Sequence, residues 1–327
     1  MPAVTYLEAI RQGLWEEMER DPSVFCIGED IGIYGGAFKV TDGFIDRFGP
    51  ERVIDTPIAE SAIVGAAFGA ALTGLRPVAE FQFIDFISCA FNQITNMLAK
   101  SHYRWGAPAP VVLRGPCGGG VHGGPFHSQN PEMHYVHTPG IKVVAPATPS
   151  DAKGLIKSAI RDNNPVLFLE HKFLYRRIKE ELPERDSGDF TVPIGKARLA
   201  REGRDLSVIT YAAMVQVALE AADTLAKEGI EVEIVDLRTL LPLDREAIVN
   251  TVRKTNKIIV LHEDVKTGGI AGEIAAIINE EAFEELDGPI VRIAALDTPV
   301  PFSPPLEEFF LPKVVDVVRE ARKLHQY

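Results

Sequence analysis

Residues Asp55 to Gly74 read DTPIAESAIVGAAFGAALTG. The prediction of the fold starts from this stretch. A turn at residues 56–57 leads into a predicted helix that has Glu60 near its start and Gly74 as its stop. Fewer than about 18 consecutive apolar residues precede Arg76, which excludes a membrane span. Small residues recur three and four positions apart on the helix, so a second helix could approach it closely. They are Ala62, Gly65, Ala66, Gly69 and Ala70. We therefore predict a helix buried between protein surfaces, with one carboxyl group at its edge.

Glu60, the only charged residue of that helix, has two interpretations. Removing a carboxyl group from water disfavours its charged form, which makes a glutamate a proton donor or a partner for a ring nitrogen. A first-turn glutamate also complements the helix dipole without any catalytic role, and for an arbitrary helix this second interpretation is favoured. The rest of the chain has to decide between them.

Composition limits the classes of function. The chain has 327 residues, 46% of them hydrophobic and 24% charged, which is ordinary for a globular enzyme with two domains. A net charge of -12 and the absence of a basic block argue against nucleic acid and anionic membranes as partners. Cys26, Cys89 and Cys117 are too scattered for a disulfide framework. The chain enters a helix after a capping box at Thr5 and Glu8, with no signal peptide, so we expect a cytoplasmic or other reducing location.

Strands and helices alternate along the chain. In the first half, apolar runs predict strands at 24–28, 52–55, 76–81, 111–114, 142–145 and 166–169. A long helix is predicted over 84–101, and another is capped by 148–151. This order indicates an α/β fold with a parallel sheet covered by helices on both faces. A second α/β unit has predicted strands at 206–211, 231–237, 257–261 and 291–295. The predicted domains are 1–183 and 205–327, joined by a linker over 184–204.

The glycine-rich stretch 115–129 is the most irregular part of the chain. It lacks the Lys-Ser/Thr ending of a phosphate-binding loop, so a loop that orders over a ligand suits it better. His127 at its exit is a candidate proton-transfer group. Other histidines lie nearby, but no carboxylate or cysteine completes a metal-ligand spacing. Aromatic residues in 81–86 fit either core packing or stacking on a flat cofactor. No GxGxxG follows the first strand, which disfavours a nicotinamide dehydrogenase.

The order of short motifs resembles one family from end to end. The motifs are Glu29-Asp30, YGGAF at 34–38, DTPIAE at 55–60, FQFIDF at 81–86, HSQNPE at 127–132 and DLRTL at 236–240. Together they resemble the β subunit of the thiamine-diphosphate-dependent 2-oxo acid dehydrogenase component. The resemblance implies a pyrimidine-binding α/β domain followed by a transketolase C-terminal-like α/β domain.

The resemblance also assigns roles to residues. Glu60 would hydrogen-bond N1′ of the cofactor's aminopyrimidine and favour the imino tautomer, which takes the proton from the thiazolium C2 before the 2-oxo acid loses carbon dioxide. His127 would contact the substrate carboxylate or steer the acyl group to lipoamide. Residues around the pyrimidine would be Glu29, Ile58, Ala59, Gln82, Phe83 and Phe86. Many relatives have tyrosine where this chain has Phe86, so stacking is retained without a hydroxyl contact. A structural potassium site would comprise Val112, Ala159, Ile160, Asp162 and Asn164, although an ordinary helix C-terminal turn fits there almost as well.

An absent motif points to partners. The family binds the diphosphate and Mg²⁺ through a Gly-Asp-Gly motif ending in Asn, and this chain has none. The resemblance therefore implies half an active site, completed by an α subunit in a heterotetramer of two α and two β chains. The C-terminal domain would contact the second β chain and dock to the lipoyl-bearing acyltransferase core.

The substrate and two other classes of function stay open. HSQNPE at 127–132 and LYRR at 174–177 look more like branched-chain enzymes, whereas YGGAF at 34–38 and LEHK at 169–172 also occur in pyruvate and acetoin relatives. One methylene in the pocket changes discrimination by only about 1–3 kcal/mol. The chain could instead be a noncatalytic scaffold that holds an α subunit. A self-sufficient transketolase-like enzyme would need the missing diphosphate motif.

Overall fold

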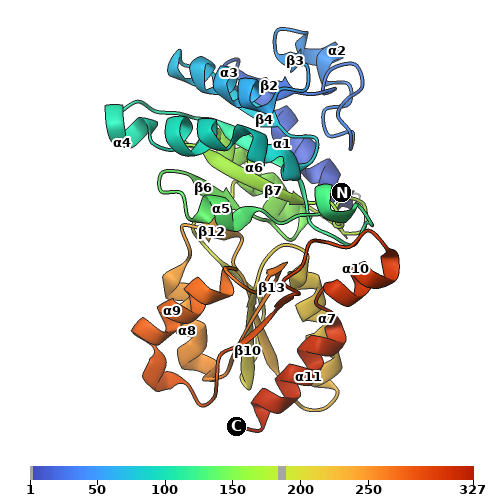
Figure 1. Cartoon of the computed structure of the whole chain (residues 1–327), viewed down its shortest axis with the longest axis vertical. Helices are drawn as coiled ribbons and strands as arrows, with labels where there is room; N and C mark the ends of the chain where they lie inside the picture. The colour runs from blue at the N-terminus through green and yellow to red at the C-terminus, as the bar shows by residue number, and fades with distance from the viewer. Residues whose placement is uncertain (1–2, 183–188) are drawn as a thin grey trace. The chain divides into compact units, whose positions relative to one another are not determined.

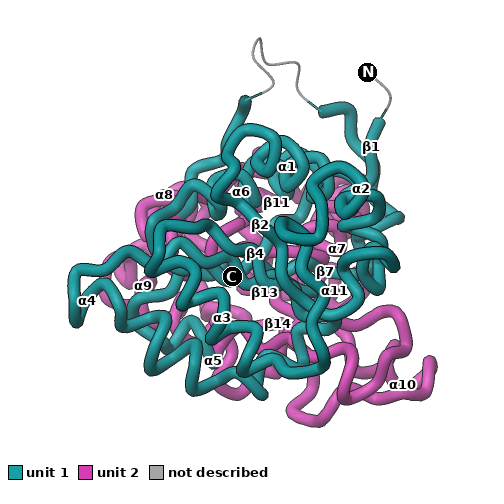
Figure 2. Tube along the Cα trace, turned by 90° about the horizontal axis from the view of Figure 1, so that it is seen from above, with its two compact units in different colours: residues 1–117, 134–194 teal, residues 118–133, 195–327 magenta. Residues whose placement is uncertain are grey.

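The computed structural model describes residues 3–182 and 189–327. The predicted boundary at 183 and the first part of the predicted linker, 184–188, lie outside the described residues. The chain forms two compact units (Figure 2). Unit 1 comprises Met1–Cys117 and His134–Ile194, and unit 2 comprises Gly118–Met133 and Gly195–Tyr327. The segment Gly118–Met133, here called the glycine loop, thus clusters with the second unit.

Unit 1 is built on a parallel sheet, as the continuous apolar strands predict. Its strands lie in the order β6-β7-β5-β4-β2-β3, and each neighbouring pair is parallel. Their bounds are β2 (Val24–Gly28), β3 (Val53–Asp55), β4 (Arg76–Glu80), β5 (Val112–Cys117), β6 (Lys142–Val144) and β7 (Val166–His171). A separate short antiparallel pair joins β1 (Val4–Thr5) to β8 (Lys179–Glu180). All parallel strands run toward one carboxyl edge, where α/β sheets bind ligands.

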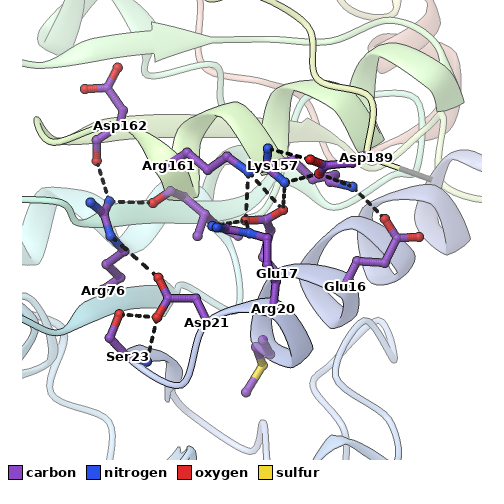
Figure 3. Close-up of polar contacts among 12 residues, drawn as sticks. Glu16, Glu17, Arg20, Asp21, Ser23, Arg76, Lys157, Arg161, Asp162 and Asp189 are labelled. Carbon is purple, nitrogen blue, oxygen red and sulfur yellow. Dashed lines mark hydrogen bonds and ion pairs between the residues drawn. The ribbon is translucent and has the colours of Figure 1, made fainter. Parts of the chain in front are cut away.

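Helices of unit 1 include α1 (Tyr6–Arg20), α3 (Glu60–Leu72) and α6 (Pro149–Arg161), with short α2 (Phe44–Phe48) and α4 (Ser101–Trp105). The predicted capping box of Thr5 and Glu8 is present at α1. At Gly13 a Cβ would lie 2.6 Å from Ile156 Cγ2, so α1 and α6 pack closely there. Buried Glu17 accepts from Arg161 Nη2 at 2.6 Å across the same contact (Figure 3). α3 packs on β4.

The prediction of one regular α-helix over 84–101 is wrong. The chain forms a 3-10 helix at Ile84–Ala90, a π-helix at Gln93–Leu98, and then α4 after a break. The Ile87 carbonyl, within the 3-10 segment, accepts the Tyr135 hydroxyl at 3.2 Å. At Gly140 a Cβ would lie 1.9 Å from the Ala99 carbonyl oxygen, so the break lies where another part of the backbone approaches. Tertiary contacts therefore override the local helical pattern.

Unit 2 has a second sheet in the order β14-β13-β10-β11-β9. Its strands are β9 (Arg198–Arg201), β10 (Leu206–Thr210), β11 (Val232–Asp236), β13 (Ile258–Val265) and β14 (Val291–Ala295). Only β9 is antiparallel to its neighbour, and it lies within the residues assigned to the linker. Figure 1 shows the sheet between α8 and α9 on one side and α7 and α11 on the other.

The helices of unit 2 are α7 (Met214–Ala226), α8 (Arg245–Thr255), α9 (Ala271–Glu281), α10 (Pro304–Phe310) and α11 (Val314–His325). The short β12 (Thr239–Leu241), α10 and α5 (Glu132–Val136) have no counterpart among the predicted elements. Among the described residues, no helix is both long and apolar enough to cross a membrane.

Candidate active site

Three predicted site segments follow three adjacent strands of unit 1. Glu29 follows β2, residues 56–60 follow β3, and residues 81–86 follow β4. The register aligns Gly28 with both Asp55 and Glu80, so the three strands end at the same level of the sheet. The parallel topology thus gathers these segments at one carboxyl edge.

Two carboxyl groups lie close together at this edge. Burial raises the pKa of Glu29, and the nearby charge of Glu60 raises it further, while a backbone hydrogen bond from Ala59 opposes the shift. Glu60 is the first residue of α3 and is half-buried within this chain. The structure therefore brings Glu29, Ala59 and Glu60 together, and the charge of Glu60 favours the protonated form of Glu29.

The turn before α3 is held by backbone contacts. The Thr56 N–H donates to the Gly28 carbonyl at 2.9 Å, and the Gly32 N–H donates to Asp55 Oδ1 at 2.7 Å. A Cβ on Gly32 would lie 2.4 Å from Asp55 Oδ2, so a larger residue would break this contact. Ile58, at the turn's tip, is 81% exposed. An exposed apolar side chain beside two carboxyl groups suits a surface that is covered by a ligand or a partner.

Gln82, Phe83 and Phe86 lie on the third segment. Gln82 Nε2 donates to Asp30 Oδ2 at 3.0 Å, which links the segments after β4 and β2. Phe83 packs edge-to-face on Phe38 with ring centroids 5.5 Å apart. Phe83 and Phe86 are both half-buried, so part of their aromatic surface remains open in the segment that follows β4. This arrangement can hold a flat ring and exchange a proton with it.

A buried ionic cluster links strands β4, β5 and β7 of this sheet. It was not predicted from the sequence. Arg114 of β5 donates to Glu80 of β4 and pairs with Glu170 of β7, whose Oε2 also accepts the Tyr175 hydroxyl at 2.6 Å. Burial raises the pKa of Glu80, and the Arg114 charge opposes this. The only sequence signal was a charged residue inside an apolar strand. The cluster ties together the neighbouring strands β4, β5 and β7.

Four of the five predicted potassium residues lie in the last turn of α6 or just after it. Ala159 and Ile160 lie in its last turn, and the carboxylate of Asp162 accepts the Asn164 N–H at 2.9 Å. Arg76 Nη1 donates to the carbonyls of Ile160 at 2.9 Å and Asp162 at 3.1 Å (Figure 3). Val112 begins β5 and pairs with Val166. The turn is oxygen-rich, but protein cations already contact part of it, including Lys142 at the Asp162 carboxylate.

His127 lies on the glycine loop in unit 2 and is half-buried. The loop's N–H groups at Gly119, Gly120 and His122 donate to carboxylates of Glu263 and Glu307, so these amides are not open to a phosphate. Within the ranges 3–182 and 189–327, no cluster of three or more histidine, cysteine or acidic residues is suited to hold a metal ion. His134 belongs to unit 1, unlike His127.

The comparisons with known proteins agree with the order of motifs. Residues 2–177 match the pyrimidine binding domain of transketolase, and residues 195–317 match the transketolase C-terminal domain. The chain is 49% identical to the 2-oxoisovalerate dehydrogenase subunit beta of Bacillus subtilis (strain 168), over 100% of both chains. The chain belongs to the β-subunit family of the 2-oxo acid dehydrogenase component.

Other members and neighbours of this β-subunit family are also similar. The pyruvate dehydrogenase E1 component subunit beta of Bacillus subtilis (strain 168) is 46% identical over 100% of both chains. A solved split-gene transketolase, described as an inactive beta4 tetramer, superposes with a TM-score of 0.80 at 25% identity, covering 99% of each chain. The family resemblance expected from the sequence and the transketolase-like fold are confirmed.

Proposed function

We propose that this chain is the β subunit of an enzyme that decarboxylates a branched-chain 2-oxo acid on thiamine diphosphate and transfers the acyl group to lipoamide. The main support for this proposal is that Glu29, Ala59, Glu60 and Gln82 lie together at the ends of three adjacent strands. The chain that carries them belongs to this family. Pyruvate is the second candidate substrate, because a pyruvate dehydrogenase β subunit is almost as similar. Acetoin remains a further alternative.

The residues at this edge fit the pyrimidine half of thiamine diphosphate. Glu60, beside the pKa-raised Glu29, would hold a proton at the ring nitrogen N1′ of the pyrimidine. Phe83 and Phe86 would stack on the ring, Gln82 and the backbone of Ile58 would bound it, and Ala59 would hold Glu29 in place. When bound, the cofactor supplies a carbon nucleophile and an electron sink for decarboxylation. His127 would contact the substrate carboxylate or the acyl group on its way to lipoamide.

An α subunit would supply the rest of the site. This chain carries no Gly-Asp-Gly motif for the diphosphate and Mg²⁺, so those groups would be bound mainly by the partner. On α3 the small residues Ala62, Ala66 and Gly69 are exposed, and a Cβ on Gly69 would meet no atom within 4 Å. That face could receive a partner helix at short distance. The assembly would contain two α and two β chains and would dock to a lipoyl acyltransferase core, in the cytoplasm.

A structural potassium ion would bind at Val112, Ala159, Ile160, Asp162 and Asn164. The carbonyl oxygens of Ile160 and Asp162 each accept one hydrogen bond from Arg76 and keep a second lone pair. A hard cation such as K⁺ could bind to those lone pairs. Replacing K⁺ by choline in the buffer should then lower the melting temperature of the chain. Equal melting temperatures in both salts at the same ionic strength would leave the turn with Arg76 and Lys142 as its cations.

Glu60→Ala in the enzyme reconstituted with its α subunit tests the proposed function. We expect 2-oxo acid-dependent dye reduction to fall by at least about 100-fold, because general acid–base groups typically contribute 10²–10⁴-fold. Assembly should stay near normal, as measured by gel filtration. Glu51→Ala, at an exposed position before β3, is the control and should keep full activity. Full activity of Glu60→Ala would instead support the noncatalytic scaffold.

A further inference from the structure

The glycine loop is anchored by two buried carboxylates from distant parts of unit 2. Glu307 of α10 is 1% exposed, and its Oε1 accepts the Gly120 N–H at 3.0 Å. Its Oε2 accepts the His122 N–H at 3.0 Å and lies 2.7 Å from His122 Nδ1. A carboxylate that is removed from water needs hydrogen-bond donors to offset its lost hydration. The buried position of Glu307 is therefore favourable only while the loop presents these N–H groups to it.

Glu263 of β13 holds both ends of the same loop. Its Oε1 accepts the Gly119 N–H at 2.6 Å and Asn130 Nδ2 at 3.0 Å. The Gly118 N–H also donates to the Gln129 carbonyl at 3.1 Å, which closes the loop at its base. His127 therefore lies between anchors on both sides.

The backbone of the loop is shaped for these contacts. Gly118, Gly120 and Gly124 have φ values of 84°, 77° and 68°, which favour glycine, and His122 has a φ of 60°. A Cβ on Gly119 would lie 3.3 Å from Glu307 Oε1. The run of glycines thus lets the backbone come close enough to present successive N–H groups to carboxylates of the same chain.

We propose that Glu307 is a positioning residue that fixes the glycine loop and, through it, the place of His127. This inference rests on the proposed function, because it assigns a catalytic consequence to the position of His127. Glu307 need not contact the substrate. Its carboxylate serves three donors, and a glutamine would present an N–H₂ group to at least one of them.

Amide hydrogen exchange and kinetics of Glu307→Gln, assembled with the α subunit, test the inference. We expect the Gly120 and His122 amides to exchange at least about tenfold faster than in the wild type, since each loses a charged acceptor. Turnover should fall at least about tenfold at unchanged cofactor affinity, because a small misplacement of a catalytic group is costly. Glu308→Gln, on the exposed side of the same helix, is the matched control for both measurements.

A double variant separates positioning from general damage. If Glu307 acts through His127, Glu307→Gln should add no further loss to His127→Ala, whereas independent effects would multiply. Unchanged exchange at Gly120 and His122, unchanged turnover, or multiplied losses would each overturn the proposal. Should Glu307→Gln not fold, Glu307→Asp gives the same comparison with a shorter carboxylate. Failure of the proposed function is distinguishable, since Glu60→Ala would then be fully active.

Discussion

Arg114 is the common cation of two buried carboxylates in unit 1. Arg114 is 1% exposed and lies between Glu80 and Glu170, while Glu132 receives the Tyr211 hydroxyl deep in unit 2. Removing Arg114 would leave the carboxylates of Glu80 and Glu170 desolvated without a counter-charge. Glu132 instead has the acidic Asp264 and Glu263 near it. Single substitutions at Arg114 and Glu132 should therefore change the stability of the fold measurably.

Arg114→Met should destabilise unit 1 by about 3–5 kcal/mol, because two buried carboxylates lose their common cation. The loss would appear as a lower urea midpoint, followed by circular dichroism. Arg253→Met removes an exposed arginine from α8 and should leave the midpoint nearly unchanged. Equal midpoints for Arg114→Met and the wild type would mean that the cluster does not hold these strands together.

Glu132 makes the stability of unit 2 depend on pH. Burial and the nearby Asp264 charge raise the pKa of Glu132 to about 8, while the Tyr211 hydrogen bond opposes the shift. The folded state therefore retains a proton that the unfolded chain releases near its ordinary value of 4.5. Stability from this group is fully present below that ordinary value and is lost as pH rises through about 8.

Glu132→Gln removes this titration. Between pH 6 and 8.5, wild type should lose about 2 kcal/mol more stability than the variant, measured by thermal melts across the range. Glu284→Gln, at an exposed position, should follow the wild-type profile. Parallel profiles for wild type and Glu132→Gln would show that Glu132 does not carry a proton in the folded chain.

At the scale of elements, α3 has one face inside the unit and one face open. Ile63, Val64, Ala67, Phe68 and Ala71 are buried, whereas the small residues lie on the exposed or half-buried side. The sequence predicted that this helix is buried between two protein surfaces, and this chain supplies one of those surfaces. The open half belongs to the proposed contact with the α subunit.

Gly69→Leu probes that open face. A Cβ there meets no atom of this chain within 4 Å, so the isolated β chain should fold with an unchanged or slightly higher melting temperature. A close helix contact would be blocked, and binding of the α subunit should weaken by at least about tenfold, measured by titration calorimetry. Gly272→Leu on α9 also meets no atom within 4 Å and is the control. Equal α affinity for the two variants would remove α3 from the interface.

The sequence predicted correctly those elements that depend on interactions between residues close together in the chain. The Thr5 capping box, the Thr148 cap and the continuous apolar strands were all readable from neighbouring residues, and each is present. The 3-10 and π segments after Ile84 were not predicted, because the contacts of this stretch with Tyr135 and Gly140 come from residues that are distant in the sequence. The glycine loop lies in unit 2, where it donates to Glu263 and to Glu307, almost two hundred positions along the chain, and no local pattern reveals these contacts.

The candidate site divides in the same way. The motif order led to Glu29, Glu60 and Gln82, and the strand register explains why these residues gather at one edge. The supporting residues Arg114 and Glu307 were missed, since each acts through partners that are far away in sequence. Residues that contact a ligand recur in recognisable motifs, whereas residues that hold those motifs in place do not.

At the scale of the whole molecule, the chain presents a pyrimidine-binding edge without a diphosphate-binding motif. We therefore expect this protein to form one half of a shared active site. The most direct measurement is dye reduction dependent on 3-methyl-2-oxobutanoate or pyruvate, with thiamine diphosphate and Mg²⁺, for the lone chain and for the chain paired with its α subunit. We expect activity only in the pair, with the branched-chain acid as the better substrate. Activity in the lone chain would contradict the shared site, and an inactive pair would contradict the catalytic role.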